Sequence, residues 1–128
     1  MSKALVVDDS RTIRMIIRRI LIDLGYEVCE AGNGLEGLKA LEADKTAVSL
    51  VLADWNMPEM NGLEMLKRLR QDPDFDSVKV LMVTTETEME QMASALEAGA
   101  NEYVMKPFSK DILLEKLELV GMLPLARQ

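Results

Sequence analysis

Five short apolar segments rich in branched side chains alternate with amphipathic segments along the whole chain. Each apolar segment predicts a β-strand, and each amphipathic segment predicts a helix. Strands that are separated by helices form parallel sheets with helices on both faces. We therefore expect a doubly wound α/β fold with a five-stranded parallel sheet and five helices. The predicted strands are 4–7, 26–29, 48–53, 78–83 and 102–105. Segment 26–30 alternates apolar residues with Glu27 and Glu30, which is typical of an edge strand.

Capping residues mark where several helices begin and end. Ser10 is a suitable N-cap for the first helix, and Gly25 follows its expected end. We expect the apolar face of this helix to comprise Ile13, Ile16, Ile17, Ile20, Leu21 and Leu24. Further signals are the capping pair Asn33 and Glu36, the stop at Gly99 and the cap at Ser109.

Length and composition indicate one ordinary domain. The chain has 128 residues, of which 48% are hydrophobic and 29% charged, enough for a packed core. We expect a domain over residues 1–122 and a short tail over 123–128, with no internal repeat. A strand-like segment begins almost at the first residue, so we expect no signal peptide or membrane span and a cytoplasmic location.

Missing residue types exclude several kinds of chemistry. The chain has no histidine, which excludes Ser-His-Asp and Cys-His nucleophiles and histidine-ligated metals. Cys29 is the single cysteine, so neither an internal disulfide nor a cysteine zinc cluster can form. Fifteen basic and 22 acidic residues give a formal charge of −7, which argues against nucleic acid or an anionic membrane as a partner.

Polar residues follow four of the predicted strands. Asp8 and Asp9 end the first, Asp54 the third, Thr84 the fourth and Lys106 the fifth. Ligands of open α/β sheets bind beyond the carboxyl ends of the strands, so these side chains converge on one crevice. Three carboxylates there favour a divalent cation such as Mg²⁺. Lys106 and the Thr84 hydroxyl suit phosphoryl oxygens, and Asp54 is the best candidate for a carboxylate nucleophile.

Four motifs, in order along essentially the whole chain, carry a family resemblance: LVVDDS (5–10), VLADWNMPEMNGLEML (51–66), VTTE (83–86) and YVMKPF (103–108). Together they resemble the receiver domain of two-component response regulators. The DWNMP segment, 54–58, is most similar to CheY-like single-domain chemotaxis regulators. The resemblance implies a flavodoxin-like strand order 2-1-3-4-5 and a signalling protein that accepts a phosphoryl group, not an enzyme with a separate substrate.

The resemblance assigns roles around the acidic residues. Asp54 is implied as the phosphoacceptor and a contributor to the metal site. Asp9 is implied to ligate Mg²⁺ directly, Asp8 to assist through water, and the backbone carbonyl of Asn56 to complete the protein ligands. Lys106 is implied to contact the phosphoryl group.

It also assigns a switch and its modulation. Lys106–Pro107 resembles the cis peptide bond of the family, and Thr84 with Tyr103 resembles its switch pair; a half-buried edge-strand tyrosine is the plainer interpretation of Tyr103. The family usually has alanine or glycine where this chain has Thr85. We expect Thr85, with Glu86 and Asn56, to modulate the lifetime of the phosphoryl group.

Two surfaces are candidate partner sites. Residues 80–105 hold five glutamates and no basic residue, and methionines adapt to irregular partners. The resemblance favours docking of a FliM-like flagellar switch protein here, although a methionine stripe is also typical of a core. The expected contacts are Met89, Met92, Tyr103, Met105 and Lys116. Arg14, Arg18 and Arg19 either help to dock a CheA-like histidine kinase or form a solvated stripe. A phosphatase partner and a monomeric state are also expected.

Other functions fit parts of the sequence. The segment 32–37, GNGLEG, matches the G-x-G-x-x-G pattern of nucleotide-binding enzymes, but Glu36 would face the pyrophosphate. A flavodoxin-like electron carrier would need hydroxyls and glycines where the chain reads DDSR, 8–11. An aspartate-dependent phosphatase would need a spaced aspartate pair. Within the receiver family, a phosphorelay intermediate unrelated to motility remains the main alternative.

Overall fold

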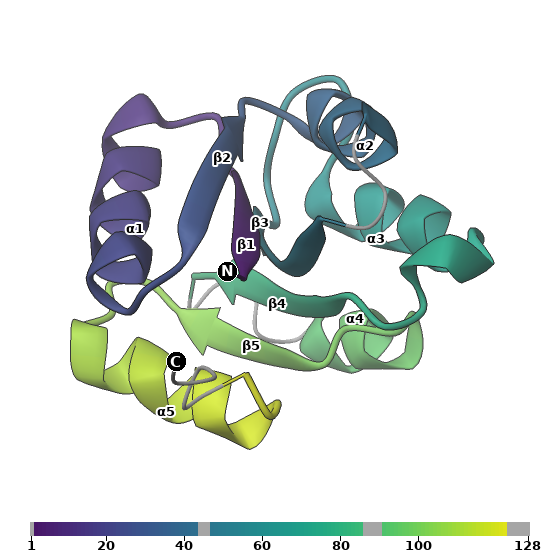
Figure 1. Ribbon diagram of the computed structural model, residues 1–128. Coiled ribbons are helices and arrows are strands. Elements are labelled where there is room, and N and C mark those ends of the chain that lie inside the picture. The colour runs from purple at the N-terminus through teal and green to yellow at the C-terminus, as the bar shows by residue number, and fades with distance from the viewer. Residues whose placement is uncertain (1, 44–46, 86–90, 123–128) are drawn as a thin grey trace.

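The computed structural model describes residues 2–43, 47–85 and 91–122, which form a parallel sheet covered by helices on both faces (Figure 1). The strands are β1 (Lys3–Val7), β2 (Glu27–Ala31), β3 (Val48–Asp54), β4 (Lys79–Thr84) and β5 (Glu102–Met105). The helices are α1 (Arg11–Asp23), α2 (Gly34–Ala43), α3 (Gly62–Arg70), α4 (Met92–Glu97), α5 (Lys110–Leu119) and the short 3₁₀ helix η1 (Pro73–Phe75).

The strand order β2-β1-β3-β4-β5 confirms the order that the family resemblance implies. All four strand pairs are parallel. Strand β2 lies at the edge, as its alternating pattern predicted, whereas β3 lies in the centre and is almost wholly buried. The strand order reverses between β1 and β3, and polar groups at their carboxyl ends therefore face a crevice where such folds bind ligands.

Two apolar layers hold the helices to the sheet. On one face, the buried cluster built around Leu5, Val51 and Met82 packs against α2, α3 and α4. On the other, the cluster built around Val6, Leu52 and Leu81 packs against α1 and α5 (Figure 1). Neighbouring strand residues alternate between the layers because side chains alternate across a strand.

The predicted caps are present at the helix ends. Ser10 Oγ accepts from the Ile13 amide, and Ser109 Oγ accepts from the Ile112 amide. The Glu36 amide donates to Asn33 Oδ1 at 2.9 Å. Gly25 and Gly99 have φ angles of 101° and 114°, in the left-handed region that glycine adopts without strain.

One helix prediction is wrong. Ile16 was expected on the buried face of α1, but its side chain is 51% exposed. Ile17 and Leu21 form the buried centre of that face. Ile16 lies about 100° around the helix from Ile17, which carries it past the edge of the sheet contact. No helix of the described segments has both the length and the apolar character needed to cross a membrane.

Candidate functional site

The sheet register places the first two acidic positions side by side. Val7 pairs with Ala53, so the residues that follow them in β1 and β3, Asp8 and Asp54, stand next to each other at the carboxyl end of the sheet. Both carboxylates are buried, with Asp8 1% and Asp54 6% exposed. Asp9 continues from Asp8 into the loop before α1 and is exposed. These positions agree with the predicted crevice.

The next two strands bring the remaining predicted groups to the same end. Asp54 pairs with Val83, and Thr84 pairs with Met105 in the neighbouring strand. Lys106 follows Met105, and its amide donates to the Thr84 carbonyl at 2.7 Å, which continues the ladder by one residue.

The three carboxylates form a compact cluster. One oxygen from each of Asp8, Asp9 and Asp54 lies within 4.8 Å of the other two. Carboxylate oxygens are hard ligands, and at this separation they suit an oxygen-ligated divalent cation that keeps several waters. The donor set therefore fits Mg²⁺, and it offers no nitrogen or sulfur ligand that would favour a softer metal.

Lys106 supplies the positive charge in the cluster. Its Nζ donates to Asp54 Oδ1 at 3.1 Å and to Asp8 Oδ2 at 3.2 Å. Burial alone lowers the pKa of the Lys106 ammonium, but the charges of Asp54 and Asp8 and their hydrogen bonds outweigh burial, so its pKa is raised. The ammonium therefore remains charged across the physiological range.

The surroundings of Asp54 perturb its protonation. The pKa of Asp54 is raised from 3.8 to about 6; burial is the largest cause and the negative charge of Asp8 adds to it, while Lys106 acts in the opposite direction. Asp54 is still mainly ionised at neutral pH. A buried carboxylate that stays ionised beside a second carboxylate is a strong candidate for a nucleophile or a metal ligand.

The loop after β3 closes tightly behind Asp54. The Trp55 amide donates to the Val83 carbonyl at 3.2 Å, and the Gly62 amide donates to the Trp55 carbonyl at 3.0 Å. A Cβ at Gly62 would lie 2.3 Å from the Asp54 carbonyl oxygen and 2.8 Å from Met82 Cε. Glycine at 62 thus lets the start of α3 pack directly on the backbone of Asp54.

The profile of the response regulator receiver domain family matches residues 4–118. The chain belongs to the response regulator receiver domain family. It is 47% identical over 119 residues to chemotaxis protein CheY1 of Helicobacter pylori, covering 92% of this chain and 95% of that protein. It is 45% identical over 117 residues to a CheY homolog of Campylobacter jejuni, covering 91% and 89%.

Structural comparison agrees with these relatives. The structure of CheY4, a chemotaxis protein of Vibrio cholerae, superposes with a TM-score of 0.85 and 38% sequence identity, covering 94% of this chain and 98% of that one. The protein is thus a response regulator of the chemotaxis type, and a signalling protein instead of a conventional enzyme.

The structure also places Thr84 and Pro107, which the sequence predicted near the acidic site. Thr84 is fully buried, and its Oγ1 donates to the Thr85 carbonyl at 3.2 Å. The Lys106–Pro107 peptide bond is cis, as the resemblance implied. Asn56 lies in the exposed loop just beyond Asp54. Glu86, expected to modulate the site, lies outside the described residues.

Tyr103 is half-buried on β5 and contacts α5. Lys116 Nζ lies 4.5 Å from the centre of the Tyr103 ring, within the range of a cation–π contact. The same ammonium lies 3.7 Å from Glu102 Oε1. Tyr103 and Lys116, predicted separately as partner contacts, are therefore in direct contact with each other.

The methionine surface agrees with the prediction only in part. Met105 is 38% exposed at the end of β5. Met92 was expected as a partner contact, but it is 5% exposed and belongs to the core beneath α4, so that expectation is wrong. Met92 is the first residue of α4 and lies on the same side of that helix as Ala95, which is also buried. Met89 lies outside the described residues.

The basic residues of α1 do not form one stripe. Arg14 reaches back to the acidic loop, where its Nη1 donates to the Asp8 carbonyl. Arg18 Nη1 lies 3.5 Å from Glu30 Oε2 and remains half exposed, and Arg19 is exposed. The sequence left Arg14 open as a kinase contact or a solvated residue and did not predict its contact with the site, because that contact depends on how α1 crosses the end of β1.

The glycine amides of the GNGLEG segment are already hydrogen-bonded, unlike those of a loop that binds phosphate. Gly32 donates to Glu36 Oε1 at 3.3 Å, Gly34 to the Met60 carbonyl at 3.2 Å and Gly37 to the Asn33 carbonyl at 3.0 Å. A Cβ at Gly34 would lie 2.7 Å from the Met60 carbonyl oxygen, so this glycine permits close packing of α2 against the loop before α3.

Proposed function

We propose that Asp54 accepts a phosphoryl group from the phosphohistidine of a CheA-like histidine kinase. The observation that carries this proposal is the pairing of a buried Asp54 carboxylate with Lys106 Nζ at 3.1 Å, beside two further carboxylates. An Asp54 oxygen attacks phosphorus, the P–N bond breaks with its electron pair left on imidazole, and a P–O bond forms. Asp54 then carries an acyl phosphate.

Asp8, Asp9 and Asp54, with the Asn56 carbonyl, are the groups that we propose hold Mg²⁺. When bound, the cation supplies positive charge that offsets the carboxylates and the phosphoryl oxygens. Lys106 is placed to leave its Asp54 contact and pair with a phosphoryl oxygen, which is a charge-assisted interaction. Hydrolysis of the acyl phosphate by water, slowed at the rim by Thr85, returns Asp54 to its free form; a phosphatase partner would accelerate the same step.

Thr84 and Tyr103 are the proposed switch. A phosphoryl oxygen on Asp54 offers the Thr84 hydroxyl a charged acceptor in place of the Thr85 carbonyl. We propose that turning that hydroxyl shifts the balance between two packing states of Tyr103, which is half-buried on β5, the strand that pairs with the strand of Thr84. A local charge change that biases two packing states is a recurrent signalling device.

The proposed output surface comprises Tyr103, Met105 and Lys116, and its proposed target is a FliM-like segment of the flagellar switch, with the regulator acting as a monomer in the cytoplasm. The chemotaxis relatives support this target. A fluorescent peptide from such a switch protein is expected to bind more tightly, by about 5- to 150-fold, after phosphorylation. Equal affinity for both forms would contradict the proposed output.

The phosphotransfer itself is tested with a small acyl-phosphate donor and Mg²⁺, followed by intact mass. We expect the gain of one phosphoryl group, which chelation of Mg²⁺ abolishes. A domain that binds Mg²⁺ yet gains no phosphoryl group, from this donor or from a histidine kinase, would contradict the proposal.

A further inference from the structure

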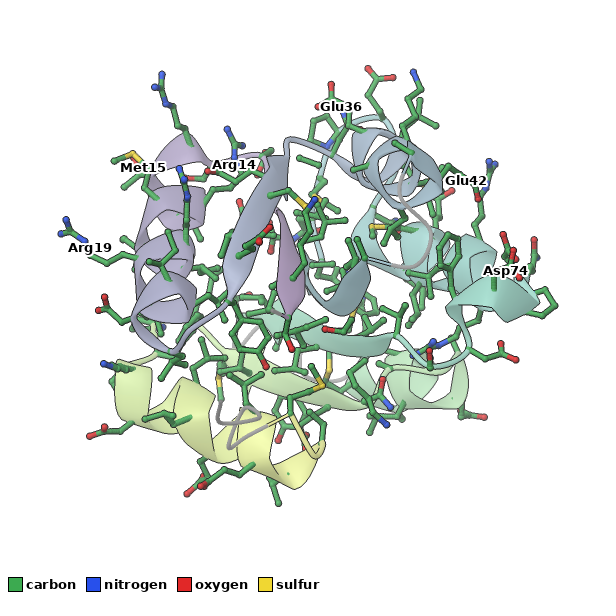
Figure 2. The ribbon with its side chains drawn as sticks, in the orientation of Figure 1. Arg14, Met15, Arg19, Glu36, Glu42 and Asp74 are labelled. Atoms are coloured by element: carbon green, nitrogen blue, oxygen red, sulfur yellow. The ribbon has the colours of Figure 1, made fainter. Side chains whose placement is uncertain are left out.

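Arg14 links the acidic loop to the edge strand of the sheet. Its Nη1 donates to the Asp8 carbonyl oxygen at 2.6 Å, and its Nε donates to Glu30 Oε1 at 3.0 Å. The Arg14 side chain is only 18% exposed. In Figure 2, Arg14 lies between α1 and β2, whereas Met15 and Arg19 lie on the outer side of the helix.

Asp8 is held at every polar atom of its residue. Its amide donates to the Ala31 carbonyl at 3.1 Å, and its carbonyl accepts from Arg14. Its carboxylate accepts from the Ser10 amide at 2.8 Å and from Lys106 Nζ at 3.2 Å. Two of these partners are backbone groups, and the third, Lys106, belongs to the acidic site itself. Among these four partners of Asp8, only Arg14 is a side chain that comes from outside the site, from a face of α1.

The Asp8 carbonyl belongs to the peptide bond that joins Asp8 to Asp9. Its direction therefore sets the direction in which the chain leaves toward Asp9. Asp9 is the exposed member of the carboxylate cluster, so its position depends on this loop backbone more than on packing.

Glu30 makes this arrangement compatible with cation binding. A bare guanidinium near the cluster would repel a divalent cation. Glu30 pairs with Arg14 at 3.0 Å and offsets that charge, while also fixing the orientation of the guanidinium fork.

We propose that Arg14 is a positioning residue that orients the Asp8–Asp9 peptide so that the three carboxylates bind Mg²⁺, with Glu30 holding the guanidinium in place. This inference rests on the proposed Mg²⁺ site. Arg14 touches no reacting atom and acts only through Asp8. Residues that orient metal ligands in this way typically change metal affinity by about 10–100-fold when they are replaced.

The sign of the effect separates positioning from charge. If Arg14 acted only as a nearby cation, its removal would strengthen Mg²⁺ binding. If it positions the loop, its removal weakens binding although a repelling charge has gone. Arg14→Met keeps the apolar stem and removes both donors and charge, whereas Arg14→Lys keeps the charge and one donor.

The experiment is a Mg²⁺ titration of the full chain, followed by the fluorescence of Trp55, the single tryptophan, which directly follows Asp54. Arg18→Met is the matched control. Arg18 is also on α1 and also lies near Glu30 of β2, but it has no contact with Asp8 in the described structure. Thermal unfolding without Mg²⁺ shows that each variant is folded.

We expect roughly tenfold weaker binding for Arg14→Met. We expect partial recovery for Arg14→Lys and nearly unchanged binding for Arg18→Met. Binding by Arg14→Met that equals or exceeds the wild type, equal losses in Arg14→Met and Arg18→Met, or Arg14→Lys binding no better than Arg14→Met would overturn the inference. A wild-type protein that binds no Mg²⁺ would instead overturn the proposed function beneath it.

Discussion

Lys106 Nζ lies 3.1 Å from Asp54 Oδ1, so the charge on the proposed phosphoacceptor is set partly by a residue 52 positions away in the sequence. Burial and the charge of Asp8 raise the pKa of Asp54, this ammonium lowers it, and the balance is a pKa of about 6. The contact depends on the parallel register of β3, β4 and β5, since Lys106 follows the last residue of β5.

Replacing Lys106 with methionine removes this opposing charge but keeps a side chain of similar length. We therefore expect the Asp54 pKa to rise above about 6. Carboxyl ¹³C chemical shifts followed across pH by NMR measure it directly. The matched control is Lys110→Met, at an exposed position at the start of α5. An Asp54 pKa that is unchanged or lowered by Lys106→Met would contradict the role assigned to Lys106.

Asp54→Asn is expected to stabilise the fold near neutral pH. The folded protein holds the Asp54 proton more tightly than the unfolded chain, so wild-type stability falls as pH rises from about 4 to about 6 and this loss is complete above that window. A shift of about two units corresponds to at most about 3 kcal/mol, and the loss of one Lys106 partner in the variant reduces the gain.

Urea unfolding of both proteins between pH 4 and pH 8 checks this sign. The stability difference, variant minus wild type, is expected to be small near pH 4, to grow through pH 6 and then to level off. A difference that shrinks as pH rises would show that Asp54 is stabilised as a carboxylate, contrary to its burial.

Gly62→Ala is expected to destabilise the protein and, at the same time, to displace the backbone of Asp54 in the acidic site. The added Cβ would lie 2.3 Å from the Asp54 carbonyl oxygen, which is backbone and cannot move away without shifting the residue. Overpacking of this kind costs about 1–3 kcal/mol. Chemical unfolding measures the loss, and Gly32→Ala is the control, since its Cβ would meet its neighbours at 3.6 Å and 3.8 Å. Equal effects of the two substitutions would contradict this packing argument.

Thr85→Ala is expected to shorten the lifetime of the phosphorylated form. Thr85 is half-buried and directly follows Thr84, whose hydroxyl we propose turns toward the phosphoryl group, so we expect the side chain at 85 to hinder attacking water. The decay of the phosphorylated mass after removal of the donor measures the lifetime, with Thr12→Ala, at an exposed position of α1, as the control. A lifetime that is unchanged or longer in Thr85→Ala would show that Thr85 does not shield the acyl phosphate.

The sheet and the acidic cluster follow from sequence because their cause is local. Strand patterns are short and strong, and parallel strands bring their carboxyl ends to one edge, so Asp8, Asp54, Thr84 and Lys106 converge without knowledge of the loops. The alternation at Glu27 and Glu30 predicted the edge position of β2 correctly for a similar reason.

Predictions that depend on how helices rotate and cross were less successful. Ile16 is exposed and Met92 is buried, because the rotation of each helix about its axis decides which side chains face the sheet. The link from Arg14 to the Asp8 carbonyl has no signal in spacing, since a basic residue on a helix is usually solvated. Arg70 is a similar case: it donates to the Gly99, Phe75 and Val78 carbonyls, three partners that only the tertiary fold assembles.

The most direct test of the central claim locates the phosphoryl group. The wild-type protein is treated with an acyl-phosphate donor and Mg²⁺ and analysed by fragmentation mass spectrometry, with Asp54→Asn, whose side chain is similar in size, treated in parallel. We predict a single phosphoryl group on Asp54 and no labelling of the variant. A phosphoryl group on another residue of the wild type, or equal labelling of Asp54→Asn, would contradict the assignment of Asp54 as the phosphoacceptor.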